Sequence, residues 1–146
     1  MSDKYDCIKL ENQLCFPLYA VSKEIIRRYK PFLDELDLTY TQYITMMALW
    51  EGAPMSVKEL GERLYLDTGT LTPLLKAMEK KGLVSRARST EDERCVLITL
   101  TAAGESLRDQ AVKVPAQIGP CIRLKPERAR ELYTLLYELI GNIAEP

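Results

Sequence analysis

Residues 57–81 read VKELGERLYLDTGTLTPLLKAMEKK and hold two helix signals separated by one short turn. Ser56 and Glu59 form a capping box in front of this stretch, which predicts a short helix over Val57–Leu64. A second helix is predicted after the turn, because apolar residues recur there with helical spacing: Leu71, Leu74, Leu75 and Met78. Gly82 is typical of a helix C-terminus. Two close helices joined by a tight turn indicate a helix-turn-helix.

The residues after Gly82 predict a β-hairpin. Leu83–Arg88 and Cys95–Leu100 favour strands, and the polar segment Ser89–Arg94 between them is typical of a hairpin loop. A hairpin directly after a helix-turn-helix indicates a winged helix-turn-helix. The fold class is therefore expected to be mainly α, of the α+β type.

Further helices are expected on the N-terminal side. The first runs from about Leu10 to Tyr29, and Pro31 closes it because the residue before a proline avoids helical geometry. Pro17 either kinks this helix or marks a start no earlier than about Asn12. A second capping box, Thr39 with Gln42, precedes the apolar stretch Tyr43–Trp50, which ends near Gly52 and Pro54.

On the C-terminal side, Thr101 caps a long helix that reaches about Val114 and resumes after Pro115 and Pro120, and Pro126 opens a final amphipathic helix. The terminal helices carry more apolar surface than so small a domain can cover, so a homodimer is expected. We expect one domain over residues 1–146, with dimerisation helices in 1–38 and 101–146 and the winged helix-turn-helix in 39–100.

The composition is that of an ordinary soluble protein, with 47% hydrophobic and 28% charged residues. No apolar run approaches the roughly 18 to 20 residues of a membrane span, and the first residues lack a secretory apolar segment. A cytoplasmic protein without a membrane partner is expected. The chain has no histidine, and its four cysteines form no Cys-x-x-Cys pair. Neither a metal site, nor another cofactor, nor a Cys-His catalytic pair is expected.

A net charge of −1 argues against indiscriminate binding to nucleic acid, so a DNA-binding surface requires local positive charge. Between Thr68 and Thr90 there are five basic side chains and one acidic one. The outward face of the second helix offers hydroxyls, a glycine and a cation suited to the major groove and to phosphates: Thr68, Gly69, Thr70, Thr72 and Lys76.

The hairpin supplies the other predicted DNA contacts. Arg94 on the loop can enter the minor groove, and Arg86 and Arg88 lie on the strands. Asp92 either holds Arg94 or anchors the loop to the body. Pro73 conflicts with a regular recognition helix, so either the helix effectively starts near Thr70 or it tolerates a distortion.

Cys15 has a richer setting than the other cysteines. An inert core thiol is the default reading of a cysteine, and it is adopted for Cys7 and Cys95. A helix start near Cys15 would favour its thiolate, and tyrosines that can bond a thiolate lie nearby in sequence: Tyr19, Tyr29, Tyr40 and Tyr43. At 1.5 Å per residue Tyr29 lies about 21 Å along the helix from Cys15, so it reaches this sulfur only from a second chain.

Four segments together resemble the MarR family, and within it the organic-hydroperoxide-sensing repressors of the OhrR type. They are LCFPLY (14–19), LTYTQY (38–43), VKELGERLYLD continued by TGTLTPLL (57–75), and EDER (91–94). The resemblance spans about residues 10–143 and accounts for Pro73, because the family carries a proline inside its recognition helix.

This resemblance implies a homodimeric repressor on a pseudo-palindromic operator. Cys15 matches the cysteine that organic hydroperoxides oxidise to a sulfenic acid, and Tyr29 and Tyr40 match the tyrosines that bond it from the partner subunit. Tyr19 is a third member of that cluster. Arg94 matches the arginine that enters the minor groove, and Asp92 its supporting acid.

Family members resolve the sulfenic acid in two ways, through a mixed disulfide with a small thiol or through an intersubunit disulfide. Cys121 lies roughly where the resolving cysteine of the second group lies; its alternative role is packing.

Two other functions stay open. The chain could be a repressor of the same fold that binds a phenolic or other small ligand in the dimer cleft, with Cys15 incidental. A thiol peroxidase is disfavoured, because the chain has no histidine and because Arg27 and Arg28 lie about three helical turns from Cys15. A repressor that is not an enzyme is therefore expected.

Overall fold

The computed structural model describes residues 3–144. Within these residues lie seven α-helices and one three-stranded sheet: α1 (Cys15–Asp34), α2 (Tyr40–Gly52), β1 (Met55–Ser56), α3 (Val57–Leu64), α4 (Thr68–Lys80), β2 (Val84–Arg88), β3 (Val96–Leu100), α5 (Ala102–Ala111), α6 (Val114–Ile122) and α7 (Pro126–Ala144). Two short 3₁₀ helices, Asp6–Ile8 and Leu10–Asn12, precede α1. The predicted winged helix-turn-helix with long terminal helices is confirmed. Residues 1–2 and 145–146 of the predicted dimerisation segments lie outside the described residues.

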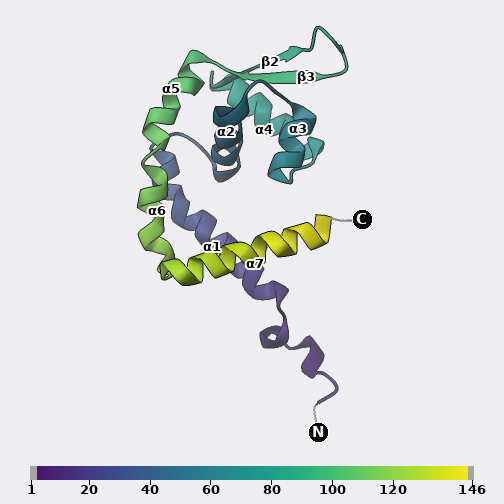
Figure 1. Ribbon diagram of the computed structural model, residues 1–146, viewed down its shortest axis with the longest axis vertical. Helices are drawn as coiled ribbons and strands as arrows, with labels where there is room; N and C mark the ends of the chain where they lie inside the picture. Colours follow the sequence, from purple (N-terminus) through teal and green to yellow (C-terminus); the bar gives the residue numbers. More distant parts are fainter. Residues whose placement is uncertain (1–2, 145–146) are drawn as a thin grey trace.

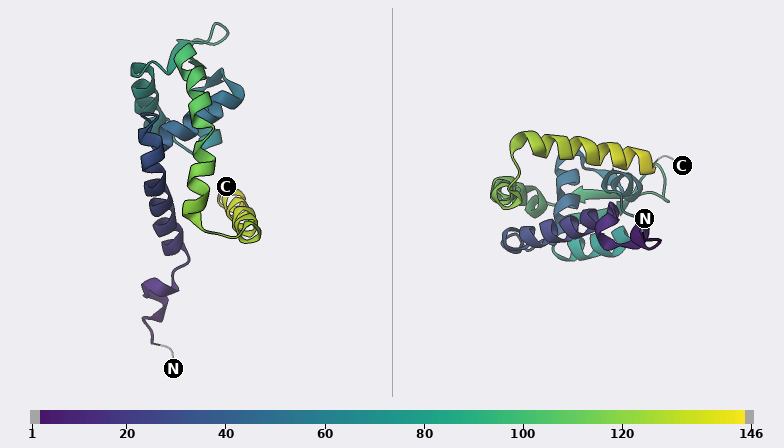
Figure 2. Two further views of the ribbon diagram at one scale, coloured as in Figure 1. Left: turned by 90° about the vertical axis from the view of Figure 1, so that its left-hand side faces the viewer. Right: turned by 90° about the horizontal axis from the view of Figure 1, so that it is seen from below.

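The elements separate into two regions (Figure 1). Helices α2, α3 and α4 gather with the sheet at one end, while α5 and α6 lead away from it and α6 packs against α1. Helix α7 turns back across α1, and the segment before α1 projects beyond the rest of the chain (Figure 2). The indole N–H of Trp50 on α2 donates to the Gly104 carbonyl on α5 at 2.9 Å, which joins the two regions.

Most of the hydrophobic core lies in the first region, where the fully buried side chains include Met46, Leu60, Leu71, Met78 and Ile98. Leu33 of α1 and Val114 of α6 are also fully buried and extend the core into the second region. Both predicted capping boxes are present: Thr39 with Gln42 begins α2, and Ser56 with Glu59 begins α3. Local sequence signals and core burial therefore agree on where these helices lie.

The sheet has the strand order β1-β3-β2, and both pairings are antiparallel. The predicted hairpin is confirmed, with Val84 opposite Leu100 and Arg88 opposite Val96, although each strand begins one residue later than predicted. Strand β1 was not predicted. It spans two residues, too few to show a strand period, and it exists because Met55 pairs with Ile98.

The prolines behave differently from the prediction. Pro31 does not close the first helix, which begins at Cys15 and continues to Asp34. A proline inside a helix leaves the carbonyl four residues earlier without its helical partner, here that of Arg27, and Arg27 is exposed to water. Pro17 is the third residue of α1, where a backbone N–H has no helical partner in any case, so the start after Asn12 is confirmed.

The C-terminal prolines also lie inside a helix. The helix capped by Thr101 ends at Ala111 rather than near Val114, and α6 then contains both Pro115 and Pro120 instead of starting after them. Pro115 is the second residue of α6, and Pro120 frees the carbonyl of Ala116, which is exposed. The predicted start of the last helix at Pro126 is confirmed.

Helix α7 buries none of its residues in this chain. Its apolar side chains are nevertheless numerous, and the exposed ones are Leu132, Tyr133, Leu135, Tyr137 and Ile143. Within residues 3–144, no helix joins enough length to enough apolar character to cross a membrane.

Candidate DNA-reading surface and thiol site

The turn between α3 and α4 fixes the angle of the helix-turn-helix. Tyr65 adopts the left-handed conformation, with φ at 55°, and the Leu66 N–H bonds the Gly61 carbonyl. A Cβ on Gly61 would lie 2.8 Å from the Leu66 carbonyl oxygen and 3.3 Å from Cδ1 of Leu71. Only glycine therefore allows α3 to approach the turn this closely.

Asp67 caps the N-terminus of α4. Its carboxylate accepts the Thr70 backbone N–H at 2.7 Å, and this bond is the main reason that the pKa of Asp67 lies below its usual value. The predicted contact residues Thr68, Gly69, Thr70 and Lys76 are exposed, and Thr72 is half-buried. The exposed hydroxyls of Thr68 and Thr70 therefore form the outward surface of the first turn, at the positive end of the helix dipole.

Pro73 lies within α4, which starts at Thr68 and not near Thr70. The carbonyl that loses its helical partner is that of Gly69, one of the exposed residues of the first turn. The distortion is therefore tolerated because the freed acceptor faces outward.

The wing loop presents Arg94 with an acidic support. Its side chain is 96% exposed, its Nε lies 3.7 Å from Oδ1 of Asp92, and its backbone N–H donates to the same oxygen at 3.0 Å. Of the two roles considered for Asp92, the structure favours holding the arginine. Arg88 donates to the Glu93 carbonyl at 2.7 Å, which orders the loop from the opposite strand.

Arg86 differs from Arg94 because it is engaged within the chain. Its Nη2 lies 3.2 Å from Oε1 of Glu79 on α4, and its backbone N–H donates to Oε2 of the same residue. Its Nε is buried without a partner among the described residues. Arg86 therefore fastens β2 to the recognition helix, and a DNA contact from it stays a prediction.

A groove of about 330 Å³ separates the start of α4 from the wing. Its lining includes the predicted residues Thr68, Thr72, Arg86 and Arg94, and also Lys58 and Cys95. Sequence reasoning missed Lys58. The pairing of β1 with β3 brings the start of α3 to the wing, and β1 itself was not predicted.

Cys15 is the first residue of α1, and its thiol is exposed and free. Tyr19 on the next turn is exposed too, and the Lys23 ammonium lies over its ring, 5.1 Å from the ring centroid. In residues 3–144 of this single chain, Cys15 makes no hydrogen bond to any tyrosine.

Tyr29, Tyr40 and Tyr43 form a cluster at the other end of α1. The ring of Tyr29 lies 5.0 Å from that of Tyr40 and 5.9 Å from that of Tyr43, measured between centroids. Burial, followed by the neighbouring phenols, raises the pKa of Tyr29 to about 12. Of the four tyrosines named from the sequence, the structure thus joins Tyr29, Tyr40 and Tyr43 and leaves Tyr19 apart. A phenol with so high a pKa stays protonated and is a hydrogen-bond donor.

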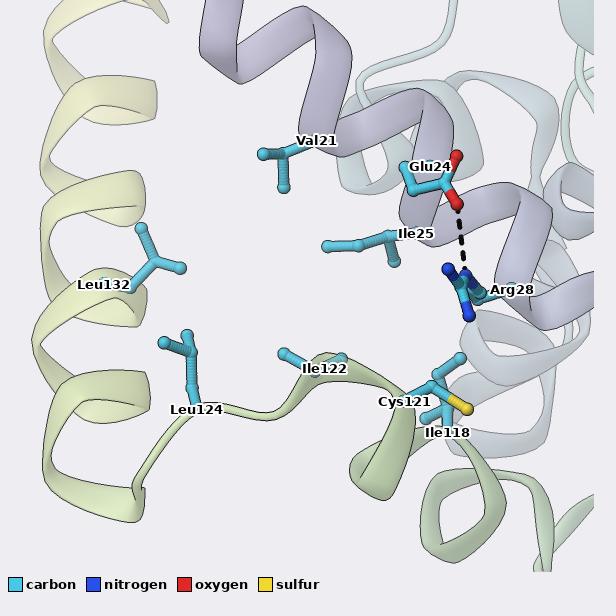
Figure 3. A pocket seen from close by; sticks show the side chains of 9 residues that line it. All are labelled: Val21, Glu24, Ile25, Arg28, Ile118, Cys121, Ile122, Leu124 and Leu132. Atoms are coloured by element: carbon cyan, nitrogen blue, oxygen red, sulfur yellow. Dashed lines mark hydrogen bonds and ion pairs between the residues drawn. The ribbon is translucent and has the colours of Figure 1, made fainter.

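Cys121 is half-buried on α6, and its thiol contacts the Gln117 carbonyl oxygen at 3.7 Å. It lines a cavity of about 410 Å³ between α1, α6 and α7, whose walls are mostly apolar, among them Val21, Ile25 and Leu132 (Figure 3). Neither Cys7, which is exposed, nor Cys95, which is half-buried, is the buried core thiol that was expected.

The helix-turn-helix, the wing arginine and the exposed first turn of α4 define this molecule as a winged-helix DNA-binding protein. Comparisons with known proteins agree. A family described as transcriptional regulator SarA/Rot matches residues 27–111. The organic hydroperoxide resistance transcriptional regulator of Bacillus subtilis (strain 168) is 51% identical over 143 residues, which are 98% of this chain and 97% of that protein.

Solved structures give the same result. Reduced AbfR bound to DNA is 32% identical, with a TM-score of 0.79 over 98% of this chain and 100% of that one; AbfR is a Staphylococcus epidermidis protein. Its disulfide form is 37% identical, with a TM-score of 0.63 over 94% of this chain and 96% of that one. Reduced MarR of E. coli is 26% identical, with a TM-score of 0.71 over 87% of this chain and 96% of that one. The chain belongs to the MarR family of transcription regulators, in its organic hydroperoxide resistance group.

Proposed function

We propose that this protein is a dimeric repressor that binds its operator when Cys15 is reduced and releases it when an organic hydroperoxide oxidises Cys15. The observation that carries the proposal is the separation of the exposed Cys15 thiol from the Tyr29–Tyr40 cluster. Tyr29 lies about 21 Å from Cys15 along α1, so a second chain is needed to bring Tyr29 and Tyr40 to the sulfur.

The proposed dimer uses residues 1–38 and 101–146, leaving 39–100 to bind DNA. The apolar faces of α1 and α7, including Phe16, Ile26 and Leu135, are exposed in one chain and gain a partner in the dimer. An antiparallel arrangement of two α1 helices across a two-fold axis places the tyrosine cluster of one copy at Cys15 of the other. Tyr19 approaches the same sulfur from its own chain.

On DNA, the first turn of α4 faces the major groove, with Thr68, Gly69, Thr70, Thr72 and Lys76 as the contacts. Arg94, supported by Asp92, enters the minor groove. The two recognition helices read a pseudo-palindromic operator with half-sites about one DNA turn apart.

The chemistry begins when the Cys15 thiolate attacks one peroxide oxygen. The O–O bond breaks, the sulfur is oxidised to a sulfenic acid, and the departing alkoxide takes up a proton and leaves as an alcohol. The added oxygen enlarges the group that the tyrosines surround. The dimer helices shift, and the distance between the two winged regions no longer matches the half-site spacing of the operator. Operator affinity therefore falls.

Cys121 is the proposed resolving thiol. Its sulfur attacks the sulfenic sulfur of the partner's Cys15, the S–O bond breaks, water leaves and an intersubunit disulfide forms. The disulfide form of AbfR is a precedent among relatives. A crosslinked dimer on a non-reducing gel that disappears in Cys121→Ser supports this route. An unchanged dimer band in Cys121→Ser removes Cys121 from the mechanism, and oxidised wild type without any crosslinked dimer assigns the second step to a small thiol.

The deciding experiment is an operator-binding titration of reduced and tert-butyl hydroperoxide-treated protein. Wild type should lose affinity on treatment, and Cys15→Ser should retain it. Cys7→Ser, which removes another exposed thiol, is the matched control and should respond as wild type does. Release from Cys15→Ser by peroxide would overturn the sensor assignment.

The two alternatives predict different outcomes. A repressor that senses a small phenolic ligand would release DNA with that ligand even as Cys15→Ser. A thiol peroxidase would consume many equivalents of hydroperoxide per chain with a thiol donor. We expect neither result, and consumption near one equivalent per Cys15 is the signature of a sensor that is not an enzyme.

A further inference from the structure

Lys81, directly after the last residue of α4, reaches across to the segment that carries the tyrosine cluster. Its ammonium donates to the backbone carbonyl of Asp37, lies 3.6 Å from the Asp37 carboxylate and donates to Oε1 of Gln42 at 3.1 Å. The lysine side chain is 30% exposed, whereas that of Asp37 is 90% exposed. The lysine is therefore partly enclosed in this contact, unlike an ordinary surface ion pair.

The Gln42 oxygen that accepts from Lys81 has a second donor. It also accepts the Thr39 backbone N–H at 3.1 Å, which is half of the capping box that begins α2. Gln42 is buried, so water does not readily replace either bond. One atom therefore joins the N-terminus of α2 to the C-terminus of the recognition helix.

Gln42 lies between two tyrosines of the cluster. Tyr40 is the first residue of α2, Tyr43 follows Gln42 directly, and their ring centroids are 6.4 Å apart. Asp37, the other partner of Lys81, holds a left-handed conformation with φ at 53° in the turn before α2. A movement of these tyrosines thus displaces the start of α2, where both Lys81 acceptors are attached.

We propose that the contact of Lys81 with Gln42 and Asp37 transmits the redox state of the partner's Cys15 from the tyrosine cluster to the recognition helix. The inference rests on the proposed function and adds to it the route by which the sensor moves α4. Lys81 acts through α2 and touches neither the thiol nor the operator bases, so it is a positioning residue. A contact between two packed elements is the physical link that such coupling requires.

The test compares operator Kd before and after tert-butyl hydroperoxide for Lys81→Met, which keeps an apolar stem and removes the donor. The ratio of oxidised to reduced Kd should fall by roughly 2- to 30-fold relative to wild type. The rate of Cys15 oxidation, followed as loss of free thiol, should not change. Lys81→Arg keeps a cation at this place and should restore most of the ratio.

Lys80→Met is the matched control, because this exposed lysine is adjacent and its loss changes the net charge by the same amount. It should keep the wild-type ratio. A wild-type ratio in Lys81→Met, or an equal fall in Lys80→Met, would overturn the coupling. If circular dichroism shows that Lys81→Met does not fold, Lys81→Gln replaces it in the same titration. Its side chain is too short to reach Asp37 and Gln42, so the ratio of oxidised to reduced Kd should fall in the same way.

The same titration separates this inference from the function on which it rests. If wild type does not respond to hydroperoxide, or if Cys15→Ser does, the proposed sensor is wrong. If wild type responds through Cys15 and Lys81→Met responds equally, the sensor stands and the transmission route fails.

Discussion

The DNA-reading surface and the thiol site differ in how much of each one chain contains. The first is complete: Asp67 caps α4, Asp92 supports Arg94, and Glu79 fastens the wing strand, all through contacts inside the chain. The thiol site is divided, with Cys15 exposed at one end of α1 and two of its predicted phenols, Tyr29 and Tyr40, near the other. A regulator built this way can couple sensing to the distance between subunits, because its sensor is assembled only where two chains meet.

The largest expected effect tests whether the first region folds by itself. Leu71→Ala removes a fully buried side chain from the helix-turn-helix and should cost about 2–5 kcal/mol of stability at any protein concentration. Leu135→Ala on α7 changes a side chain that is exposed in one chain. Its cost should appear only as weaker dimerisation. Thermal denaturation at several concentrations distinguishes the two; a concentration-independent loss in Leu135→Ala would contradict a dimer role for α7.

The second prediction concerns the divided site. In a mixed dimer of one Cys15→Ser chain and one Tyr29→Phe/Tyr40→Phe chain, the one remaining Cys15 faces the intact tyrosines of the other copy. Such a dimer should recover wild-type oxidation kinetics, while homodimers of either variant should not. Thiol loss in co-purified, differently tagged chains measures this. No recovery in the mixed dimer would mean that the site lies within one chain.

The third prediction sharpens the account of the DNA side. Arg94→Ala should weaken operator binding by about tenfold, because an exposed arginine on the wing is positioned to contact DNA. Arg108→Ala on α5, also an exposed arginine paired with a carboxylate, should leave affinity unchanged. Fluorescence anisotropy at fixed salt measures both. Equal losses would show that Arg94 contributes general charge and not a specific contact.

The smallest effect concerns the tyrosines. Because the pKa of Tyr29 is raised from 10.0 to about 12 in the folded chain, its neutral form stabilises the fold below pH 10, and this contribution is lost as the pH rises through about 12. Tyr29→Phe should remove that part of the loss. Tyrosinate absorbance and urea unfolding at pH 9 and 11 follow it; a decline that is unchanged in Tyr29→Phe would assign it to other groups.

The sequence predicted best what short-range chemistry determines. The capping boxes at Thr39 and Ser56 and the apolar spacing from Leu71 to Met78 placed three helices correctly, because those signals act within one or two turns. The exposed first turn of α4 followed from the same pattern. Pro31, Pro115 and Pro120 misled the helix boundaries, since whether a freed carbonyl reaches water depends on which face is exposed.

The missed features depend on contacts distant in sequence. Strand β1 exists only through its pairing with β3, and the place of Lys58 beside the wing follows from it. The ring contact of Tyr43 with Tyr29 arises because α2 packs against α1, and Lys81 meets Gln42 across 39 positions of sequence. The partners of Cys15 belong to an assembly of two chains, which the periodicity of one chain does not describe.

Trp50 offers a practical consequence. It is the only tryptophan in the sequence, and its indole bonds the Gly104 carbonyl where the DNA-binding region meets α5. The tryptophan fluorescence of the protein therefore originates at this joint alone. Emission recorded without any attached dye should report in real time whether the joint opens when the sensor reacts.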